Sequence, residues 1–393
     1  MAVRKLFGMT TVADLERDPH ALLASIRPVG WVDALDGWVV TSRESAMQVM
    51  RDPATFTVDD PRFSTAQVVG PSMLSLDGSP HAAHRAPFEH PFSLAQTRAR
   101  FTTFVEEETD RLVSLVEPLG AADLRRTVAG PLSVAVVAHS LGLAQTEAAT
   151  VLEWYQDISG SVSGISAGLP ATAEGAAAFA KLHAHVAGSI DQADSLIAEA
   201  ARAGLGTDEV VANAAVLMFG GIETTEGMIT NALWHLLTNP EQLGLVLADP
   251  SLLPNAVEES LRLEPAAAVV DRYATRDVEL AGASIKRGDL VTVSLAGAGR
   301  DPAVFPDPDV YDVRRSNARR HLAFASGPHI CLGMHLARLE AVTALTALLT
   351  RLPDLLLDPA SPPPRGLVFR KPTAVDVTWT VGGVRASRPD SSA

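Results

Sequence analysis

Apolar residues recur three and four positions apart through most of this chain, and they alternate with polar residues in only a few short stretches. The helical pattern is almost continuous from Ser79 to about Thr238, resumes after Pro254, and returns over Leu332–Leu352. Such spacing places apolar side chains on one face of a helix. The pattern therefore predicts a large helical body.

One predicted helix is unusually long. We expect Thr207 to be its N-cap, two acidic residues to occupy its first turn, and Asn239-Pro240 to end it. Helices in globular proteins average about 11–12 residues, far fewer than this one has. Polar residues such as Glu223 interrupt its apolar stretch, so we expect a buried core helix and not a membrane span.

Short β segments flank the helical pattern. The pair Asp36-Gly37 between two apolar stretches predicts a hairpin, because this dipeptide accepts the positive φ angles of a tight turn. Further segments with β character cover residues 267–274, 278–280, 290–295, 367–369 and 375–381. Together with the helices they predict a mainly α fold with a small β portion.

Composition and charge narrow the functional classes. The chain has 393 residues, 47% of them hydrophobic, which is ordinary for a globular protein. Its net charge of -14 repels phosphate, so we expect no nucleic-acid partner. The N-terminus shows no apolar core of a signal peptide, and we expect a soluble, cytoplasmic protein that binds no membrane.

Cys331 is the single cysteine of the chain, which excludes intrachain disulfides and multi-cysteine metal sites and fits a reducing compartment. It lies in the run FASGPHICLG from Phe324 to Gly333, directly before an apolar helix. The N-terminal amides of that helix favour the thiolate. A thiolate beside glycines suits a soft metal, although a lone cysteine can also be a small buried hydrophobe.

This run resembles the haem-binding loop of the cytochrome P-450 superfamily, whose pattern is matched at Phe324, Gly327, His329, Cys331 and Gly333. The chain departs from the pattern at Ala325, where the family usually has glycine. The resemblance implies the cytochrome P-450 fold, with a large helical body and a small β subdomain. It also implies a haem b (iron protoporphyrin IX) with Cys331 as the ligand of its iron.

The resemblance further implies one haem-thiolate monooxygenase domain over residues 1–393. Within it we expect a β-containing N-terminal part at about 11–75 and a helical body at about 79–264. A segment of helix, β structure, meander and cysteine loop follows at about 254–340. A C-terminal helix and β structure cover 332–385.

Glu259 and Arg262 are three residues apart on a predicted helix and therefore share one face. Alone, they would be read as an ordinary helical ion pair. The resemblance implies that they pair with each other and with an arginine or histidine of the meander at Asp301–Arg320, and so support the cysteine loop. The sequence does not single out one of the meander arginines.

Four basic side chains can serve the two carboxylates of a haem. Carboxylates inside a protein need charge-assisted partners. Each of the four could equally be a solvated surface residue, but the resemblance implies that they act as a set: His81, Arg85, Arg272 and His329.

The long helix contains two adjacent glycines, Gly220 and Gly221, followed by Glu223 and Thr224. Each glycine costs roughly 1 kcal/mol relative to alanine in a helix, so the site requires a close approach or a distortion. One reading is a helix contact at the glycines, with the two polar residues facing solvent. The resemblance implies instead the oxygen-binding bend, at which Glu223 and Thr224 organise proton delivery.

The resemblance also implies a mostly aliphatic substrate pocket. Its weakest part is Gln145–Gly206, where the segments that cover the pocket look shorter than is usual. The side chains expected to line the pocket are Val68, Val69, Met73, Leu217, Met218, Ile222, Ala267, Val269 and Phe369.

Together with these residues, the resemblance implies a monomeric haem-thiolate monooxygenase that uses O2 to hydroxylate or otherwise oxidise a small or medium apolar molecule, in secondary metabolism or catabolism. The sequence contains no flavin or iron–sulfur module, so the resemblance implies a ferredoxin and a ferredoxin reductase as electron donors, with NAD(P)H as the ultimate source. Oxidative coupling, desaturation or a peroxide-driven reaction are alternatives on the same haem machinery. A non-catalytic haem sensor is a further alternative that would not need Glu223 and Thr224.

A group of arginines near the cysteine loop is a candidate docking patch for an acidic ferredoxin. The alternative is that they are buried structural residues. The group consists of Arg314, Arg315, Arg319, Arg320 and Arg338.

Overall fold

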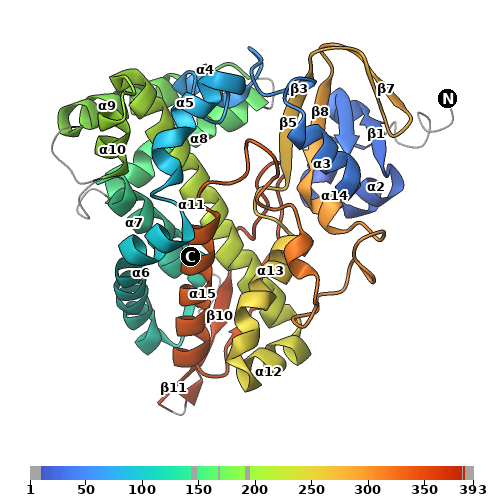
Figure 1. The fold of residues 1–393 in the computed structure, drawn as a ribbon. Coiled ribbons are helices and arrows are strands. Elements are labelled where there is room, and N and C mark those ends of the chain that lie inside the picture. The colour runs from blue at the N-terminus through green and yellow to red at the C-terminus, as the bar shows by residue number, and fades with distance from the viewer. Residues whose placement is uncertain (1–9, 143–147, 167–168, 191–194, 383, 386–393) are drawn as a thin grey trace. The chain divides into compact units, whose positions relative to one another are not determined.

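The computed structural model describes residues 10–142, 148–166, 169–190, 195–382 and 384–385. Helices dominate it, and the β structure is confined to short strands (Figure 1), as the sequence predicts. The chain forms two compact units. Unit 1 comprises the residues up to Phe56, then Val105–Leu132 and everything from Glu223 onward; unit 2 comprises Thr57–Phe104 and Ser133–Ile222.

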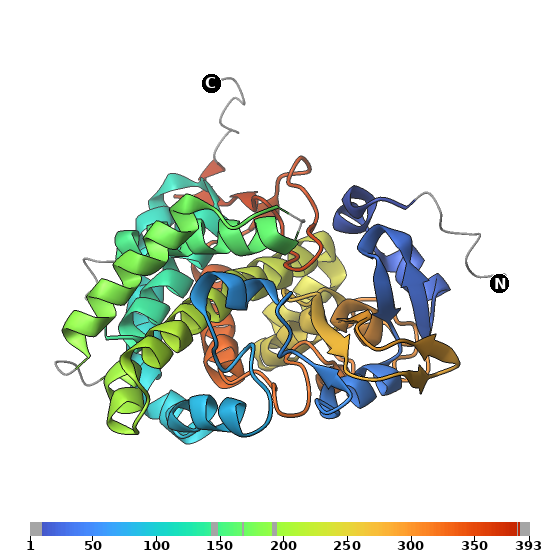
Figure 2. The same ribbon diagram turned by 90° about the horizontal axis from the view of Figure 1, so that it is seen from above.

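A mixed five-stranded sheet gives unit 1 its β portion. Its strands, in spatial order, are β1 (Val29–Val32), β2 (Gly37–Val40), β8 (Leu290–Ser294), β5 (Val269–Ala274) and β3 (Phe56–Thr57). β2 pairs with β8 in parallel, whereas β1 and β5 join antiparallel. The blue N-terminal strands therefore lie beside the orange ones (Figures 1 and 2), although they are far apart in the sequence.

One face of this sheet packs on α3 (Arg43–Arg51) through a core that includes Val40, Met50 and Val293, each at most 1% exposed. The predicted hairpin forms, but its turn differs from the prediction. A 3-10 turn over Asp33–Leu35 connects the strands, and Asp36 alone, with φ 45°, adopts the left-handed conformation.

The other elements of unit 1 are helices and very short strands. The helices are α1 (Val12–Arg17), α2 (His20–Ser25), α12 (Pro240–Ala248), α13 (Leu253–Leu263), α14 (Leu295–Gly299) and α15 (Met334–Arg351). The strands are β4 (Ala121–Asp123), β6 (Val278–Leu280), β7 (Ala283–Ile285), β9 (Leu356–Leu357), β10 (Asp376–Thr378), β11 (Thr380–Val381) and β12 (Val384–Arg385). The strand predicted at 367–369 is reduced to a single bridge between Ala267 and Phe369.

Unit 2 is helical. Its helices are α4 (Ser64–Val69), α5 (Gly78–Glu89), α8 (Ala148–Ser166), α9 (Ala173–Ser189) and α10 (Leu196–Arg202). Three helices contribute residues to both units, namely α6 (Leu94–Val116), α7 (Gly130–Ser140) and α11 (Thr207–Thr238). Within the described ranges, no helix has both the length and the apolar character needed to cross a bilayer.

The long helix α11 is uninterrupted over Thr207–Thr238, as the apolar pattern predicts. Its start is shifted by one residue, because Thr207 is the first helical residue and not the cap. Gly206 precedes it, and the N–H of Gly206 donates to Glu209 Oε2 at 2.8 Å. Glu209 in the acidic first turn thus accepts a hydrogen bond from a backbone N–H that has no acceptor within the helix.

Candidate active site

The cysteine loop folds back on itself before α15. The N–H of Cys331 donates to the carbonyl of Phe324 at 2.8 Å, and the N–H of Ile330 donates to that of Gly327 at 3.1 Å. Ala325 has φ 59°, a left-handed conformation that costs a non-glycine residue roughly 1–2 kcal/mol. Ala325 therefore places a side chain at a position whose backbone conformation favours glycine, which the family usually has there.

The loop also rests directly on the N-terminal part of unit 1. A Cβ on Gly327 would lie 2.5 Å from the carbonyl oxygen of Met50, so only glycine fits this contact. Arg51 Nε donates to Ser326 Oγ at 2.9 Å. Helix α3 therefore fixes the loop from one side.

Cys331 is partly exposed and lies three residues before the first residue of α15, whose N-terminus favours a thiolate. At Gly333 the position of an absent Cβ has no heavy atom within 4 Å, so space is open at this end of the loop. The thiolate of Cys331 would be an accessible soft ligand beside the positive end of α15, and there is free space at Gly333. This combination fits a large flat group that carries a soft metal. These residues therefore fit a haem.

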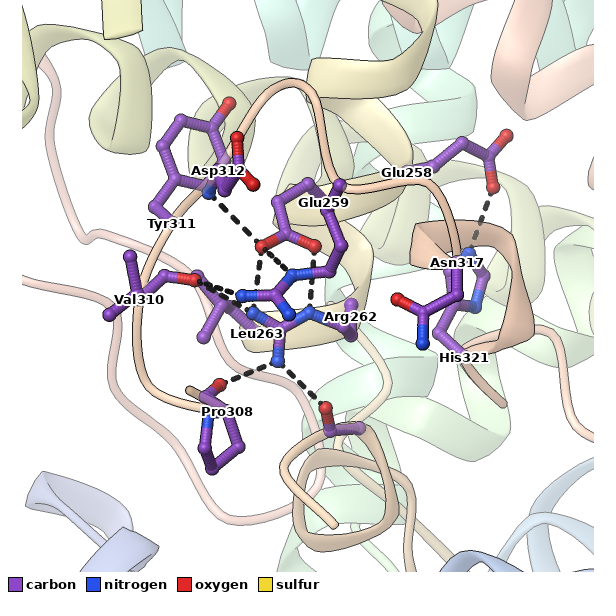
Figure 3. A network of polar contacts seen from close by, with 12 residues as sticks. Glu258, Glu259, Arg262, Leu263, Pro308, Val310, Tyr311, Asp312, Asn317 and His321 are labelled. Atoms are coloured by element: carbon purple, nitrogen blue, oxygen red, sulfur yellow. Dashed lines mark hydrogen bonds and ion pairs between the residues drawn. The ribbon is translucent and has the colours of Figure 1, made fainter. Parts of the chain in front are cut away.

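A buried ion-pair network joins α13 to the meander that precedes the cysteine loop (Figure 3). Glu259 and Arg262 on α13 are both 0% exposed, and Arg262 Nε and Nη2 donate to the two carboxylate oxygens at 2.7 and 2.8 Å. Arg315 Nε adds a bond of 2.8 Å to Glu259 Oε1. Arg262 Nη1 also donates to the carbonyls of Gly299 and Pro308. The structure thus selects Arg315 as the meander partner that the sequence left open.

A second network, centred on Glu258, was not predicted from the sequence. Glu258 accepts from His321 Nε2 at 2.9 Å and from Arg338 Nε and Nη2 at 2.6 and 3.0 Å. Burial by itself would raise the pKa of Glu258, but the hydrogen bonds from His321 and Arg338 outweigh it and lower this pKa to about 2. The guanidinium of Arg338 lies 4.5 Å from the centre of the Phe324 ring. This network therefore connects α13 and α15 to the first residue of the cysteine loop.

The two networks correct the expected docking patch. Arg315 forms an ion pair with Glu259, and Arg338 forms an ion pair with Glu258. Both are structural residues. The exposed members of the group are Arg314, Arg319 and Arg320.

The four expected partners of the haem carboxylates lie in different units. His81, which is 5% exposed, and Arg85 are one turn apart on α5 in unit 2. Arg272 on β5, also 5% exposed, and His329 in the cysteine loop belong to unit 1. Arg85 and His329 are half-buried, and all four basic side chains are donors suited to carboxylates.

The two adjacent glycines of α11 have different surroundings. A Cβ on Gly221 would lie 2.6 Å from Val137 Cγ2 of α7, so Gly221 permits a helix contact. The corresponding position at Gly220 has no heavy atom within 4 Å outside its own helix. The first reading of the pair, a helix contact, therefore holds for Gly221 and not for Gly220. Glu223 and Thr224, one turn further on, are both half-buried.

The expected pocket residues are also divided between the units. In unit 2, Val69, Met73, Met218 and Ile222 are buried, and Val68 and Leu217 are half-buried. In unit 1, Ala267 and Phe369 are half-buried and joined by their bridge.

Val269 does not fit the pocket prediction. Its side chain packs against the apolar cluster that contains Leu15, Leu23 and Val39. Its neighbour Val270 packs against the opposite cluster, because successive residues of a strand point to opposite faces. We therefore place Val269 in the N-terminal core and not in the substrate pocket.

Comparison with known proteins agrees with this geometry. The family model for cytochrome P-450 matches residues 247–368, which include α13, the meander and the cysteine loop. Cytochrome P-450 monooxygenase PikC of Streptomyces venezuelae is 34% identical over 370 residues, which cover 88% of this chain and 86% of the relative. Nocardicin C N-oxygenase of Nocardia uniformis is 34% identical over 367 residues, covering 88% and 90%.

A solved structure, that of CalO2, has a TM-score of 0.85 at 29% identity and covers 94% of this chain and 98% of the other. The chain belongs to the cytochrome P-450 family. It has the cytochrome P-450 fold, as the sequence predicts, and it is a monooxygenase of this family, whose members carry a haem.

Proposed function

We propose that this chain binds a b-type haem through the Cys331 thiolate and oxidises a small or medium apolar molecule with O2. The observation that carries the proposal is the closed cysteine loop, which is supported by α3 on one side and by two buried carboxylate–arginine networks on the other. Relatives named as monooxygenases come from Streptomyces, which supports a role in secondary metabolism. The single thiol supports a cytoplasmic location.

Each part of the chain has a defined task in this proposal. When bound, a thiolate-ligated haem supplies oxygen activation, because electron donation from sulfur favours O–O cleavage. The N-terminal amides of α15 hold the sulfur of Cys331 as thiolate. His81, Arg85, Arg272 and His329 would pair with the carboxylates of the haem, and the aliphatic residues around Ala267 and Phe369 would exclude water.

Glu223 and Thr224 supply the protons that the reduction of O2 consumes. An apolar pocket contains no proton donor of its own, so a hydroxyl and an acid must be positioned beside it. The Thr224 hydroxyl would hold the proton to be delivered, and the Glu223 carboxylate would replace it from solvent. A purely haem-binding sensor needs neither group.

Replacing Thr224 by alanine is expected to lower the product formed per NAD(P)H about tenfold and to divert the electrons to hydrogen peroxide. The probe is the steroid, fatty acid or macrolide that gives the largest low-to-high-spin shift in a ligand screen. Its binding and the rate of haem reduction should change little, because the substitution removes only a hydroxyl and one methyl group. Product, peroxide and NAD(P)H consumed are measured together with surrogate redox partners.

Thr225→Ala is the matched control, since the adjacent hydroxyl is removed from the same helix. An unchanged product-to-NAD(P)H ratio in Thr224→Ala would contradict the proton path. If the wild-type protein consumes no oxygen with any redox partner, the sensor alternative is favoured. If product forms only with peroxide, the peroxide-driven alternative is favoured.

We also propose that a ferredoxin, itself reduced by a ferredoxin reductase, delivers the electrons at an arginine patch next to the cysteine loop. The patch consists of Arg43, Arg51, Arg314, Arg319 and Arg320, of which all except Arg43 are exposed. Burial, followed by the positive charges of Arg320 and Arg51, lowers the pKa of Arg43, so these guanidinium groups lie close enough to repel one another. Arg51 contacts the loop residue Ser326, so the patch is continuous with the loop.

Charge reversal at Arg314 and Arg320 is expected to slow haem reduction by an acidic ferredoxin at low salt about tenfold. Attraction between the two proteins steers encounter and is screened above about 0.15 M salt, where the Debye length is about 8 Å. Stopped-flow reduction rates over a salt series measure the effect. Arg126→Glu, an exposed arginine outside the patch, is the control. Equal rates and salt slopes in the two variants would exclude the patch.

A further inference from the structure

Two carboxylates and two cations form a cluster around the acid of the proposed proton path. Lys371 Nζ lies 2.7 Å from Glu223 Oε1 and also contacts Glu226 Oε2. Arg125 Nε lies 3.0 Å from the other carboxylate oxygen of Glu226. These four side chains, which we call the Lys371 cluster, are between 10% and 25% exposed, so water screens them only partly.

Lys371 is placed to orient the Glu223 carboxylate, because its ammonium contacts both acids of the cluster. Glu223 and Glu226 are three residues apart on one face of α11, and two carboxylates so close repel each other. A lysine ammonium is compact and has three donors, so it can bond both acids at once. Arg125 holds Glu226 from the far side, which leaves Lys371 as the cation that contacts both acids.

The backbone of Lys371 is fixed independently of its charge. Its N–H and C=O pair with Arg365, each at 3.2 Å, and close the turn at Arg365–Lys371. The N–H of Arg370 donates to the carbonyl of Ala266, and the side-chain amide of Asn231 donates to the carbonyl of Arg370 at 2.9 Å. The turn is therefore attached to α11 three turns beyond the glycine pair.

Two glycines make room for this attachment. A Cβ on Gly227 would lie 2.7 Å from Ala266 Cβ and 3.6 Å from Lys371 Cβ. A Cβ on Gly130 would lie 3.0 Å from Glu226 Oε1. The close approach of the turn to α11 and the position of Glu226 thus both depend on the missing side chains.

We propose that Lys371 is a positioning residue for the proton path: it fixes the carboxylate of Glu223, the residue before Thr224, and connects it to the turn that carries Phe369. This inference rests on the proposed function. Lys371 from the turn contacts Glu223, Glu226 lies on the same face of α11, and Arg125 acts through Glu226.

The first test needs no catalytic activity. Urea unfolding of the haem-loaded full chain is followed for Lys371→Met, Glu223→Gln and the double variant. If the Lys371 ammonium and the Glu223 carboxylate stabilise each other, Glu223→Gln lowers the unfolding midpoint clearly less in the Lys371→Met background than in the wild type. Additive shifts would overturn the proposed contact.

The second test measures coupling with the apolar probe from the ligand screen. Lys371→Met is expected to lower product per NAD(P)H about threefold, while the spin-shift affinity for the probe stays within about twofold. Lys371→Arg, which keeps the charge, should recover at least about half of the loss, whereas a residue needed only for packing would not be rescued in this way. Lys286→Met is the matched control, because Lys286 pairs with Asp277 on an exposed hairpin of the same unit.

The outcomes separate this inference from the proposed function. If Thr224→Ala uncouples the enzyme and Lys371→Met behaves like Lys286→Met, the positioning role is wrong and the proton path stands. If both Thr224→Ala and Lys371→Met keep normal coupling, the proton path itself is wrong. Loss in Lys371→Met with rescue by Lys371→Arg supports the inference.

Discussion

Replacing Glu259 by glutamine is expected to lower the free energy of unfolding by about 3–5 kcal/mol, which is the usual cost of breaking a buried ion pair. The variant leaves the guanidinium groups of Arg262 and Arg315 in the protein interior without a counter-charge. Arg262 is itself 0% exposed, and burial lowers its pKa. Its positive charge would therefore remain buried without the carboxylate that compensates for the loss of water. Because the network holds the meander that leads into the cysteine loop, we also expect faster haem loss.

Urea unfolding, with the haem absorbance followed in parallel, measures both effects. Asp309→Asn is the matched control, since Asp309 pairs with Arg300 in the same meander but its side chain is 75% exposed. Exposed pairs contribute about 0–1 kcal/mol, so this control should change little. A Glu259→Gln variant as stable as Asp309→Asn would show that the buried network does not hold the loop region together.

The sequence predicted those parts of the fold that depend on local spacing. Helix α11 follows from a long apolar period, and α13 places Glu259 and Arg262 on one face because they are three residues apart. The motif around Cys331 carries its own geometry, since the loop closes on itself through the bond from the N–H of Cys331 to the carbonyl of Phe324. In these cases the neighbours in sequence are also the neighbours in space.

The missed contacts join residues that are distant in sequence. The meander has no periodicity, so nothing in the sequence distinguished Arg315 from Arg314, its exposed neighbour. Glu258 and Arg338 are 80 residues apart, and Lys371 and Glu226 are 145 residues apart. Such pairs depend on how the chain returns to α13 and α11, which local patterns do not specify.

The error at Val269 has a different cause. The segment was recognised as β structure, but which apolar cluster each of its two adjacent valines contacts depends on the register of β5 in the sheet. Val269 opposes Ser294 and packs on the N-terminal core. A shift of one residue in the register of β5 would move each valine to the opposite face of the sheet.

Replacing Cys331 by histidine is expected to abolish both thiolate ligation and monooxygenase turnover. The chain has no other cysteine, so no second sulfur can take its place. Histidine can still ligate haem iron, but it lacks the electron donation of a thiolate that favours O–O cleavage. The variant should retain haem, because the networks of Glu258 and Glu259 are untouched, and this separates loss of the ligand from loss of the fold.

The most direct measurement is the absorption spectrum of the reduced, carbon monoxide-bound protein. We predict that the wild type shows the red-shifted Soret band that gives the cytochrome P-450 family its name, and that Cys331→His retains haem but lacks this band. Ser326→Ala, in the same loop, is the control and should keep the band. A red-shifted band that persists in Cys331→His would contradict ligation by Cys331.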